Sequence, residues 1–211
     1  MAIMIGITIV FMIMLSKGSL GLMDGLILIS MLVLFLWDQF VAARKNRAEV
    51  AAELLDDVQA VQGGLGVAVA LLVVGFVLLP FGAWLTVDSA QAIAISIGVP
   101  DEIIGLTIVA IGTSLPELAA SLMAVLRGNS NVAIGNVVGS NIFNIAAIMG
   151  VTTVITQVEV SSIFVTFDMW IMLACALWLA WIACYPKQIS KLGGMLLTGA
   201  YAAFIIISFA S

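Results

Sequence analysis

Histidine is absent from this 211-residue chain, and charged residues of both signs make up only 9% of it. Without imidazole, the chain cannot build a histidine-ligated metal site or use histidine as a general base. Its two cysteines, Cys175 and Cys184, share one apolar stretch, where the pattern is typical of core thiols rather than of a metal motif. Its seven Lys and Arg residues form no basic patch, which excludes nucleic acid as a partner.

Hydrophobic residues make up 64% of the chain, more than a soluble domain of this length can hide from water. The apolar runs are continuous and about 20 residues long without alternation, which excludes a membrane β-barrel. We therefore predict an all-α fold, a polytopic transmembrane helical bundle with about seven spans. The seven apolar segments are 2–16, 22–41, 65–86, 101–126, 132–156, 167–185 and 193–209.

One polar segment, ARKNRAEVAAELLDDVQAVQ, interrupts the apolar sequence at 43–62. Its apolar residues recur at helical spacing, which favours a surface linker helix over a regulatory domain. If the loops alternate between seven spans, all Lys and Arg residues but Lys17 fall on one side. The positive-inside rule then places the 43–63 linker in the cytoplasm. The residues on that side are Arg44, Lys45, Arg47, Arg127, Lys187 and Lys191.

An acidic residue, Glu117, lies deep in an apolar stretch, within the run IGTSLPE. A carboxylate near the centre of a membrane helix costs about 2.5 kcal/mol or more, and a bound cation would offset that cost. Pro116 removes a backbone donor and predicts a break that frees nearby carbonyls to face a ligand. The acids near the predicted segment ends are interpreted as interfacial: Asp24, Asp38, Asp88 and Asp168.

Two polar stripes follow from helical spacing. The first contains Ala110, Thr113, Ser114, Glu117 and Ser121. The second contains Asn136, Ser140 and Asn144, and the pair Gly135 and Gly139 beside it predicts a close helix contact. Facing stripes of this kind would supply hard oxygen ligands, which suit Na⁺ or Ca²⁺. The alternative is that each hydroxyl only bonds its own backbone and that the glycines only serve packing.

The runs GTSLPE at 112–117 and GNVVGSNIFN at 135–144 resemble the α-repeat of the sodium/calcium exchanger family, within the cation/calcium antiporter superfamily. The two motifs stand in the family's order on adjacent predicted helices. The resemblance implies that 1–42 forms the last two helices of a preceding repeat and that 43–63 links the two repeats. It also implies that 64–211 is one five-helix half of an inverted pair, with its α-repeat at 101–156.

The resemblance implies a secondary antiporter, not an enzyme, which exchanges Na⁺ for Ca²⁺ by alternating access. It makes Glu117 the carboxylate shared by both ions, with side-chain and backbone oxygens from Thr113 and Ser114. The further ligands that it implies are the Ala110 carbonyl, Ser140 and Asn144. Ca²⁺ and Na⁺ are then transported ions, and no prosthetic cofactor is expected. The expected location is multi-pass in a lipid bilayer, the bacterial inner (plasma) membrane.

Two departures from the family pattern shape these expectations. The chain has one α-repeat, so the opposing glutamate is missing, and we expect a C-terminal part that needs the N-terminal repeat or a second chain. Asn144 is an acid in some relatives. The alternatives are coupling to H⁺ or K⁺, and a non-transporting half that needs a partner. An intramembrane enzyme is least favoured, because the sequence shows no histidine, no second acid facing Glu117 and no serine–lysine pair at membrane depth.

Overall fold

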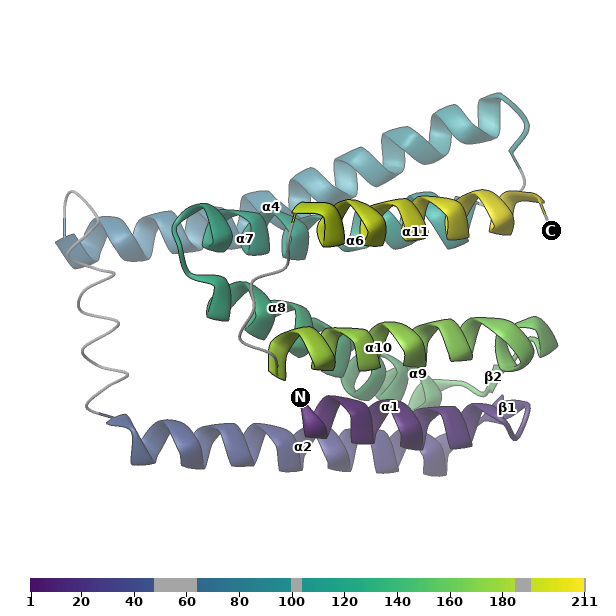
Figure 1. Ribbon diagram of the computed structural model, residues 1–211, viewed down its shortest axis with the longest axis horizontal. Helices are drawn as coiled ribbons and strands as arrows, with labels where there is room; N and C mark the ends of the chain where they lie inside the picture. The colour runs from purple at the N-terminus through teal and green to yellow at the C-terminus, as the bar shows by residue number, and fades with distance from the viewer. Residues whose placement is uncertain (48–63, 100–103, 185–190, 211) are drawn as a thin grey trace. The chain divides into compact units, whose positions relative to one another are not determined.

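The computed structural model describes residues 1–47, 64–99, 104–184 and 191–210 (Figure 1). The chain divides into two compact units, each with its own packing. The first unit joins Met1–Arg47 to Asn129–Gln188, and the second joins Ala48–Gly128 to Ile189–Ser211. The predicted repeat boundaries at 42 and 63 stay a prediction, and most of the predicted linker lies outside the described residues.

The first unit is built on helices from both ends of its sequence. Its core follows one face of α1, where Met4, Ile7 and Phe11 recur at helical spacing and are buried. Helix α1 packs against α2 and α10, and α2 packs along η2 and α9. The elements are α1 (Ala2–Leu15), β1 (Ser19–Leu20), α2 (Leu22–Lys45), α8 (Ser130–Ile142), the π-helix η2 (Phe143–Met149), α9 (Gly150–Ile155), β2 (Val158–Glu159), the π-helix η3 (Phe164–Asp168) and α10 (Met169–Cys184).

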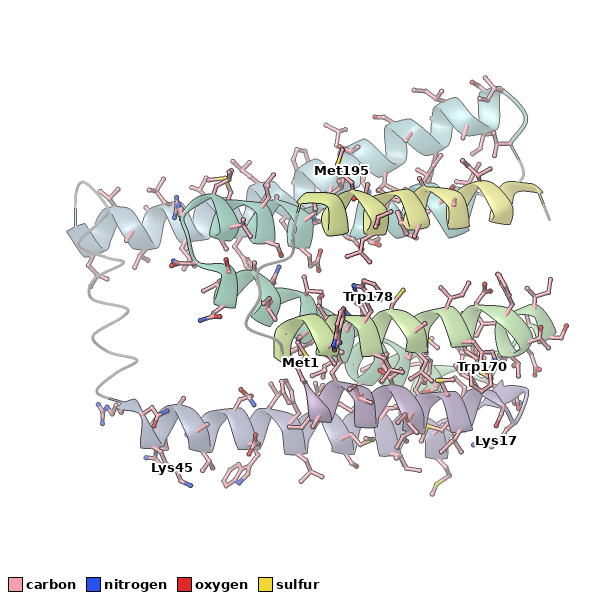
Figure 2. All side chains as sticks on the ribbon, viewed as in Figure 1. Met1, Lys17, Lys45, Trp170, Trp178 and Met195 are labelled. Carbon is pink, nitrogen blue, oxygen red and sulfur yellow. The ribbon has the colours of Figure 1, made fainter. Side chains whose placement is uncertain are left out.

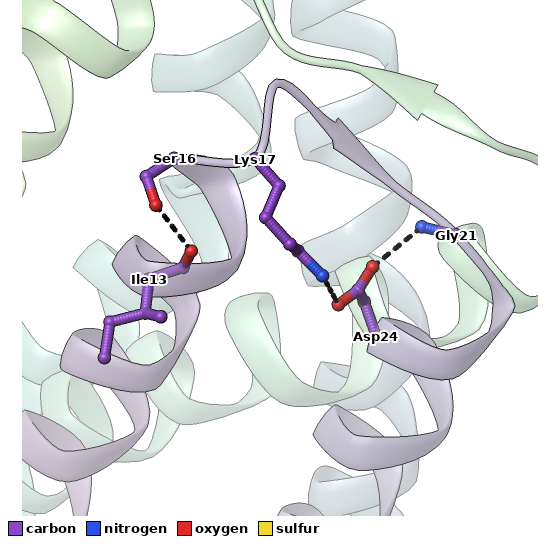
Figure 3. A network of polar contacts seen from close by, with 5 residues as sticks. All are labelled: Ile13, Ser16, Lys17, Gly21 and Asp24. Carbon is purple, nitrogen blue, oxygen red and sulfur yellow. Dashed lines mark hydrogen bonds and ion pairs between the residues drawn. The ribbon is translucent and has the colours of Figure 1, made fainter.

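Two short strands join distant loops of this unit. Ser19 pairs with Glu159 and Leu20 with Val158 in an antiparallel arrangement, and Gly18 makes the turn before them with a φ of 80°. Asp24 pairs with Lys17 and also accepts a hydrogen bond of 3.0 Å from the Gly21 backbone N–H (Figure 3). This carboxylate therefore satisfies a backbone donor at the beginning of α2.

Helices α2 and α9 cross at two glycines. A Cβ at Gly25 would lie 2.6 Å from the Gly150 carbonyl oxygen and 2.6 Å from Oγ1 of Thr153. A Cβ at Gly150 would lie 3.0 Å from the Ile29 side chain. Position 25 therefore needs glycine, because a side chain there would meet the Gly150 backbone, and a side chain at Gly150 would require Ile29 to shift.

The second unit is built around one long helix. Helix α4 (Gly64–Ser96) packs against the π-helix η1 (Gly105–Val109), α6 (Ala110–Thr113) and α7 (Leu115–Leu126). The unit also contains α11 (Lys191–Ala210). The predicted end of α4 at 86 was wrong, because the Ala-rich sequence after Asp88 has high helix propensity although it is less apolar. Asp88 therefore lies inside a helix and not near its end.

The helical membrane fold is confirmed, and each of the seven predicted segments coincides with helical structure. Among the described residues, four helices are long and apolar enough to cross a membrane, or five if a bent pair forms one span. Helix α1 is shorter, at 14 residues. These candidate spans are Leu22–Lys45, Gly64–Ser96, Ser130–Ile155 and Phe164–Trp181, with Thr107–Thr113 and Leu115–Leu126 as the bent pair.

Large apolar side chains project outward from these helices (Figure 2). Trp170 and Trp178 of α10 are 57% and 48% exposed, and Met195 of α11 is 73% exposed. Such surfaces suit contact with lipid rather than with water. Cys175, which the sequence suggested was a core thiol, is free and exposed on α10. Core and lipid-facing positions are both apolar, so the sequence pattern alone does not separate them.

Candidate cation site

The predicted break in the fourth apolar segment lies at Ser114. Helix α6 ends there and α7 begins at Leu115, and the two arms of this segment differ in direction by 46°. Ser114 has φ −93° and ψ 1°, outside the helical range, while its N–H still donates to the Ile111 carbonyl over 3.1 Å. Pro116 falls in the first turn of α7, where its missing N–H costs no helical hydrogen bond.

Glu117 also lies in the first turn of α7. A negative charge there is favourable, because the N-terminus of a helix carries a partial positive charge. The residue is half-buried, and its Oε2 atom is buried. The break therefore gives the carboxylate of Glu117 a helix N-terminus that stabilises its charge. It also interrupts the regular helical backbone next to that carboxylate.

The two hydroxyls next to the break donate to the helix backbone. Oγ1 of Thr113 donates to the carbonyls of Val109 and Ala110, over 2.9 and 3.2 Å. Oγ of Ser114 donates to the Ala110 carbonyl over 3.2 Å. Backbone bonding and cation binding are compatible here, because a hydroxyl that donates its proton keeps its lone pairs. The Ala110 carbonyl accepts from both hydroxyls, so it reaches a cation only where one of them turns away.

The second polar stripe belongs to the first unit. Ser140 lies on α8, and its Oγ donates to the Val137 carbonyl over 3.0 Å. The side-chain amide of Asn141 also donates to that carbonyl, over 2.8 Å. Asn144 is the second residue of η2 and lines a mainly apolar cavity of about 400 Å³. Phe11, Leu15, Leu20 and Phe164 also line this cavity.

The predicted ligands therefore fall into two groups. Ala110, Thr113, Ser114 and Glu117 follow one another through α6 and α7 in the second unit. Ser140 and Asn144 belong to the first unit, and a single site formed by both groups stays a prediction. Within the described residues, no group of three or more His, Cys, Asp or Glu side chains could hold a metal ion. A cation site here would thus depend on hydroxyl, amide and backbone oxygens.

The close helix contact predicted at Gly135 and Gly139 is not seen among the described residues. A Cβ at Gly135 or Gly139 would meet nothing within 4 Å, whereas Gly112 and the pair Gly25 and Gly150 are tightly packed. Two π-helices were not predicted from the sequence: η1 directly precedes Ala110, and η2 contains Asn144. Irregular helical turns of this kind often occur at functional sites. Their hydrophobic pattern does not differ visibly from that of an α-helix.

Residues 67–210 match the family model described as sodium/calcium exchanger protein. This chain belongs to the sodium/calcium exchanger family. The resemblance seen at 112–117 and 135–144 is thus confirmed, and the family is one of cation/calcium antiporters in the membrane.

The relatives of this chain include bacterial and archaeal proteins. It is 41% identical to the putative antiporter CaxA of Alkalimonas amylolytica, over 66% of this chain and 45% of that protein. This chain is 32% identical to the inner membrane protein YrbG of Escherichia coli, over 90% of this chain and 60% of YrbG. This chain is 34% identical to the sodium/calcium exchanger MaX1 of Methanosarcina acetivorans, over 70% of this chain and 42% of MaX1. The exchanger chain therefore spans less than two thirds of the length of these relatives.

A solved structure has the same fold. The sodium-calcium exchanger NCX_Mj, soaked with Na⁺ and Sr²⁺, matches with a TM-score of 0.71 and 28% identity. The match covers 100% of the exchanger chain and 64% of NCX_Mj. The likeness extends over both units of this chain, and it supports an integral membrane protein built as a helical bundle.

Proposed function

We propose that this chain forms the C-terminal part of a secondary antiporter that exchanges Na⁺ for Ca²⁺ by alternating access. The observation that carries the proposal is the broken helix, which places Glu117 in the first turn of α7, directly after the hydroxyls of Thr113 and Ser114. Glu117 is the carboxylate that both ions share. The other proposed ligands are the oxygens of Thr113, Ser114, Ala110, Ser140 and Asn144.

One carboxylate is too little charge for a stable Ca²⁺ site. Ca²⁺ takes six to eight oxygen ligands, and its desolvation must be offset by negative charge. Glu117 supplies one formal negative charge, and every other proposed ligand is neutral. We therefore propose that a second acid comes from an N-terminal repeat or from a second chain. We place the protein in the bacterial inner membrane, with the 43–63 linker in the cytoplasm, as the Lys and Arg distribution indicates.

The test is Ca²⁺ uptake into liposomes that contain the purified chain, driven by a Na⁺ gradient. Replacing that gradient with one of K⁺ or H⁺ separates the alternative coupling ions. We expect Glu117→Gln to lower the uptake by about 100-fold or more, because removing one partner of a buried charge pair costs about 3–5 kcal/mol. Asp38→Asn, which removes an exposed acid of α2, is the matched control.

Each outcome has a distinct meaning. Uptake that depends on both Na⁺ and Glu117 would show that copies of the chain assemble a complete exchanger. No uptake from folded wild-type protein would favour a half that needs its missing repeat. Wild-type uptake by Glu117→Gln would contradict the assignment of the site.

A further inference from the structure

Val87 of α4 fills the space where a side chain at Gly112 of α6 would lie. A Cβ at Gly112 would overlap the Cγ2 methyl of Val87 and would lie 3.4 Å from its Cβ. Gly112 is the one buried residue among the four of α6, and Val87 is half-buried. Both residues belong to the second unit, where α4 packs against α6 (Figure 1). Helix α6 is therefore held through its backbone at this contact.

Helix α6 cannot fix its own position. It has four residues, with the π-helix η1 before it and the break at Ser114 after it. So short a helical piece is not stable by itself, and its orientation depends on the helix against which it packs. Thr113 and Ser114 directly follow Gly112 in the chain. The contact with α4 thus fixes the backbone that carries both hydroxyls.

Two small residues of α4 lie on the same helical face as Val87. The buried residues of α4 are Ala83 and Ala94, which share one helical face with Val87 at spacings of four and seven. The side chain of Val87 occupies the space that a Cβ at Gly112 would need. Without the two methyls of Val87, α6 would lose this contact, and its register against α4 would be set less firmly.

We propose that Val87 is a positioning residue, which fits the space left by Gly112 and holds Thr113 and Ser114 in the orientation that binds the transported cation. The cation part of this inference rests on the proposed function. The positioning part rests on the contact between Val87 and Gly112 alone. The two parts can therefore fail separately.

Four variants test the inference: Val87→Ala, Gly112→Ala, the double variant of both, and the control Gly105→Ala. A Cβ at Gly105 meets nothing within 4 Å, although this residue belongs to the same broken helix. Two properties of the purified chain are measured. One is hydrogen–deuterium exchange of the backbone amides at 110–118. The other is the concentration of Ca²⁺, and separately of Na⁺, that gives half of the maximal shift in thermal unfolding.

Val87→Ala should speed amide exchange at 110–115 and raise the half-saturating Ca²⁺ concentration about tenfold, because small misplacements of binding groups are costly. Gly112→Ala should have the same or a larger effect. The double variant should return close to the wild type, because the new methyl at position 112 then lies at an ordinary distance from the Cβ of residue 87. A role in stability alone would lower the unfolding temperature without changing the half-saturating concentration.

Unchanged amide hydrogen exchange at 110–115 in Val87→Ala would overturn the inference. So would a double variant whose amide exchange and half-saturating Ca²⁺ concentration are no closer to the wild type than those of Gly112→Ala. If Gly112→Ala does not fold, a folded double variant still supports the inference. The overlap between the Val87 side chain and the added methyl at position 112 would then be the cause of the misfolding. If neither ion shifts the unfolding of the wild type, the isolated chain binds no cation, as expected of a half that needs a second acid, and the amide-exchange comparison still decides the role of Val87.

Discussion

Two segments of this chain hold polar groups within apolar helices, and they do so with different backbone structure. The broken segment (η1, α6 and α7) is interrupted at Ser114 and contains Glu117. The continuous segment (α8, η2 and α9) runs unbroken over Ser130–Ile155 and contains no acid. Each includes a π-helix next to its polar residues. The carboxylate of Glu117 thus has a helix end beside it, which stabilises negative charge, whereas the hydroxyls and amides of the continuous segment lie within helical turns.

The two segments also share one feature, a glycine contact with a long helix. Val87 of α4 fits against Gly112 of the broken segment, and Gly25 of α2 fits against Gly150 of the continuous segment. The second contact includes a backbone atom at close range, the Gly150 carbonyl oxygen, whereas the close atoms of the first belong to the Val87 side chain. We therefore expect the continuous segment to be the more rigid of the two.

The largest expected effect is a loss of stability at the α2–α9 crossing, where α2 packs against the continuous segment. Gly25→Ala should lower the free energy of unfolding by about 3 kcal/mol, because the added methyl meets the backbone carbonyl of Gly150 as well as the side chains of Thr153 and Val154. Denaturant unfolding of the purified chain in detergent measures this loss. The matched control is Gly6→Ala in α1, where a Cβ meets nothing within 4 Å. Equal stability of the two variants would contradict the tight crossing.

The next effect tests whether the continuous segment contributes ligands. Asn144→Asp should lower the half-saturating Ca²⁺ concentration about tenfold, because a second carboxylate would supply the charge that Glu117 lacks. Asn131→Asp adds the same charge in the first turn of α8, away from the polar stripe, and should change little. Ca²⁺-dependent thermal unfolding compares the two. Identical responses would remove Asn144 from the proposed site.

A smaller effect is expected from the break itself. Pro116→Ala should change the free energy of unfolding by less than about 1 kcal/mol, because a proline in the first turn replaces no helical hydrogen bond. It should slow Na⁺-driven Ca²⁺ uptake about threefold, since an alanine lets the chain continue a straight helix through Ser114. A large loss of stability would show that the proline, rather than the packing on α4, maintains the bend.

The smallest effect concerns the hairpin before α2. Lys17→Met should cost less than about 1 kcal/mol of unfolding free energy, because the lysine of this ion pair is exposed to water, which screens its charge, although Asp24 is buried. Lys17 is 54% exposed, and its partner Asp24 still accepts the Gly21 N–H in the variant. Repeating the measurement in high salt should remove most of the difference. A loss above about 2 kcal/mol would mean that the ion pair, and not the glycine crossing, holds the first unit together.

The sequence was enough to predict the helical elements and the break. Apolar runs marked all seven helical segments, and Pro116 marked the interruption of the fourth. It misjudged the end of α4, because an apolar-run criterion stops at Asp88 while helix propensity continues. It missed β1 and β2, since two-residue strands form only when tertiary packing brings their loops together.

The candidate ligands could be named from the sequence, but the residues that pack against their helices could not. Gly112 and Gly150 look like Gly135 and Gly139 in the sequence, and only the first two meet a neighbouring helix closely. Which glycine is packed depends on how distant helices cross, and no local pattern encodes that crossing. The same limit applies to Val87, which is one of many valines in apolar helices.

The order of synthesis gives the α2–α9 crossing a further consequence. Gly25 emerges from the ribosome more than a hundred residues before Gly150, its partner in the first unit. At about 5–20 residues per second, α2 waits in the bilayer for roughly 6–25 s before that partner exists. During this interval its bare glycine faces lipid or the insertion machinery. The first unit is thus completed late, and a ribosome pause between these two positions would prolong its exposure to quality-control proteases.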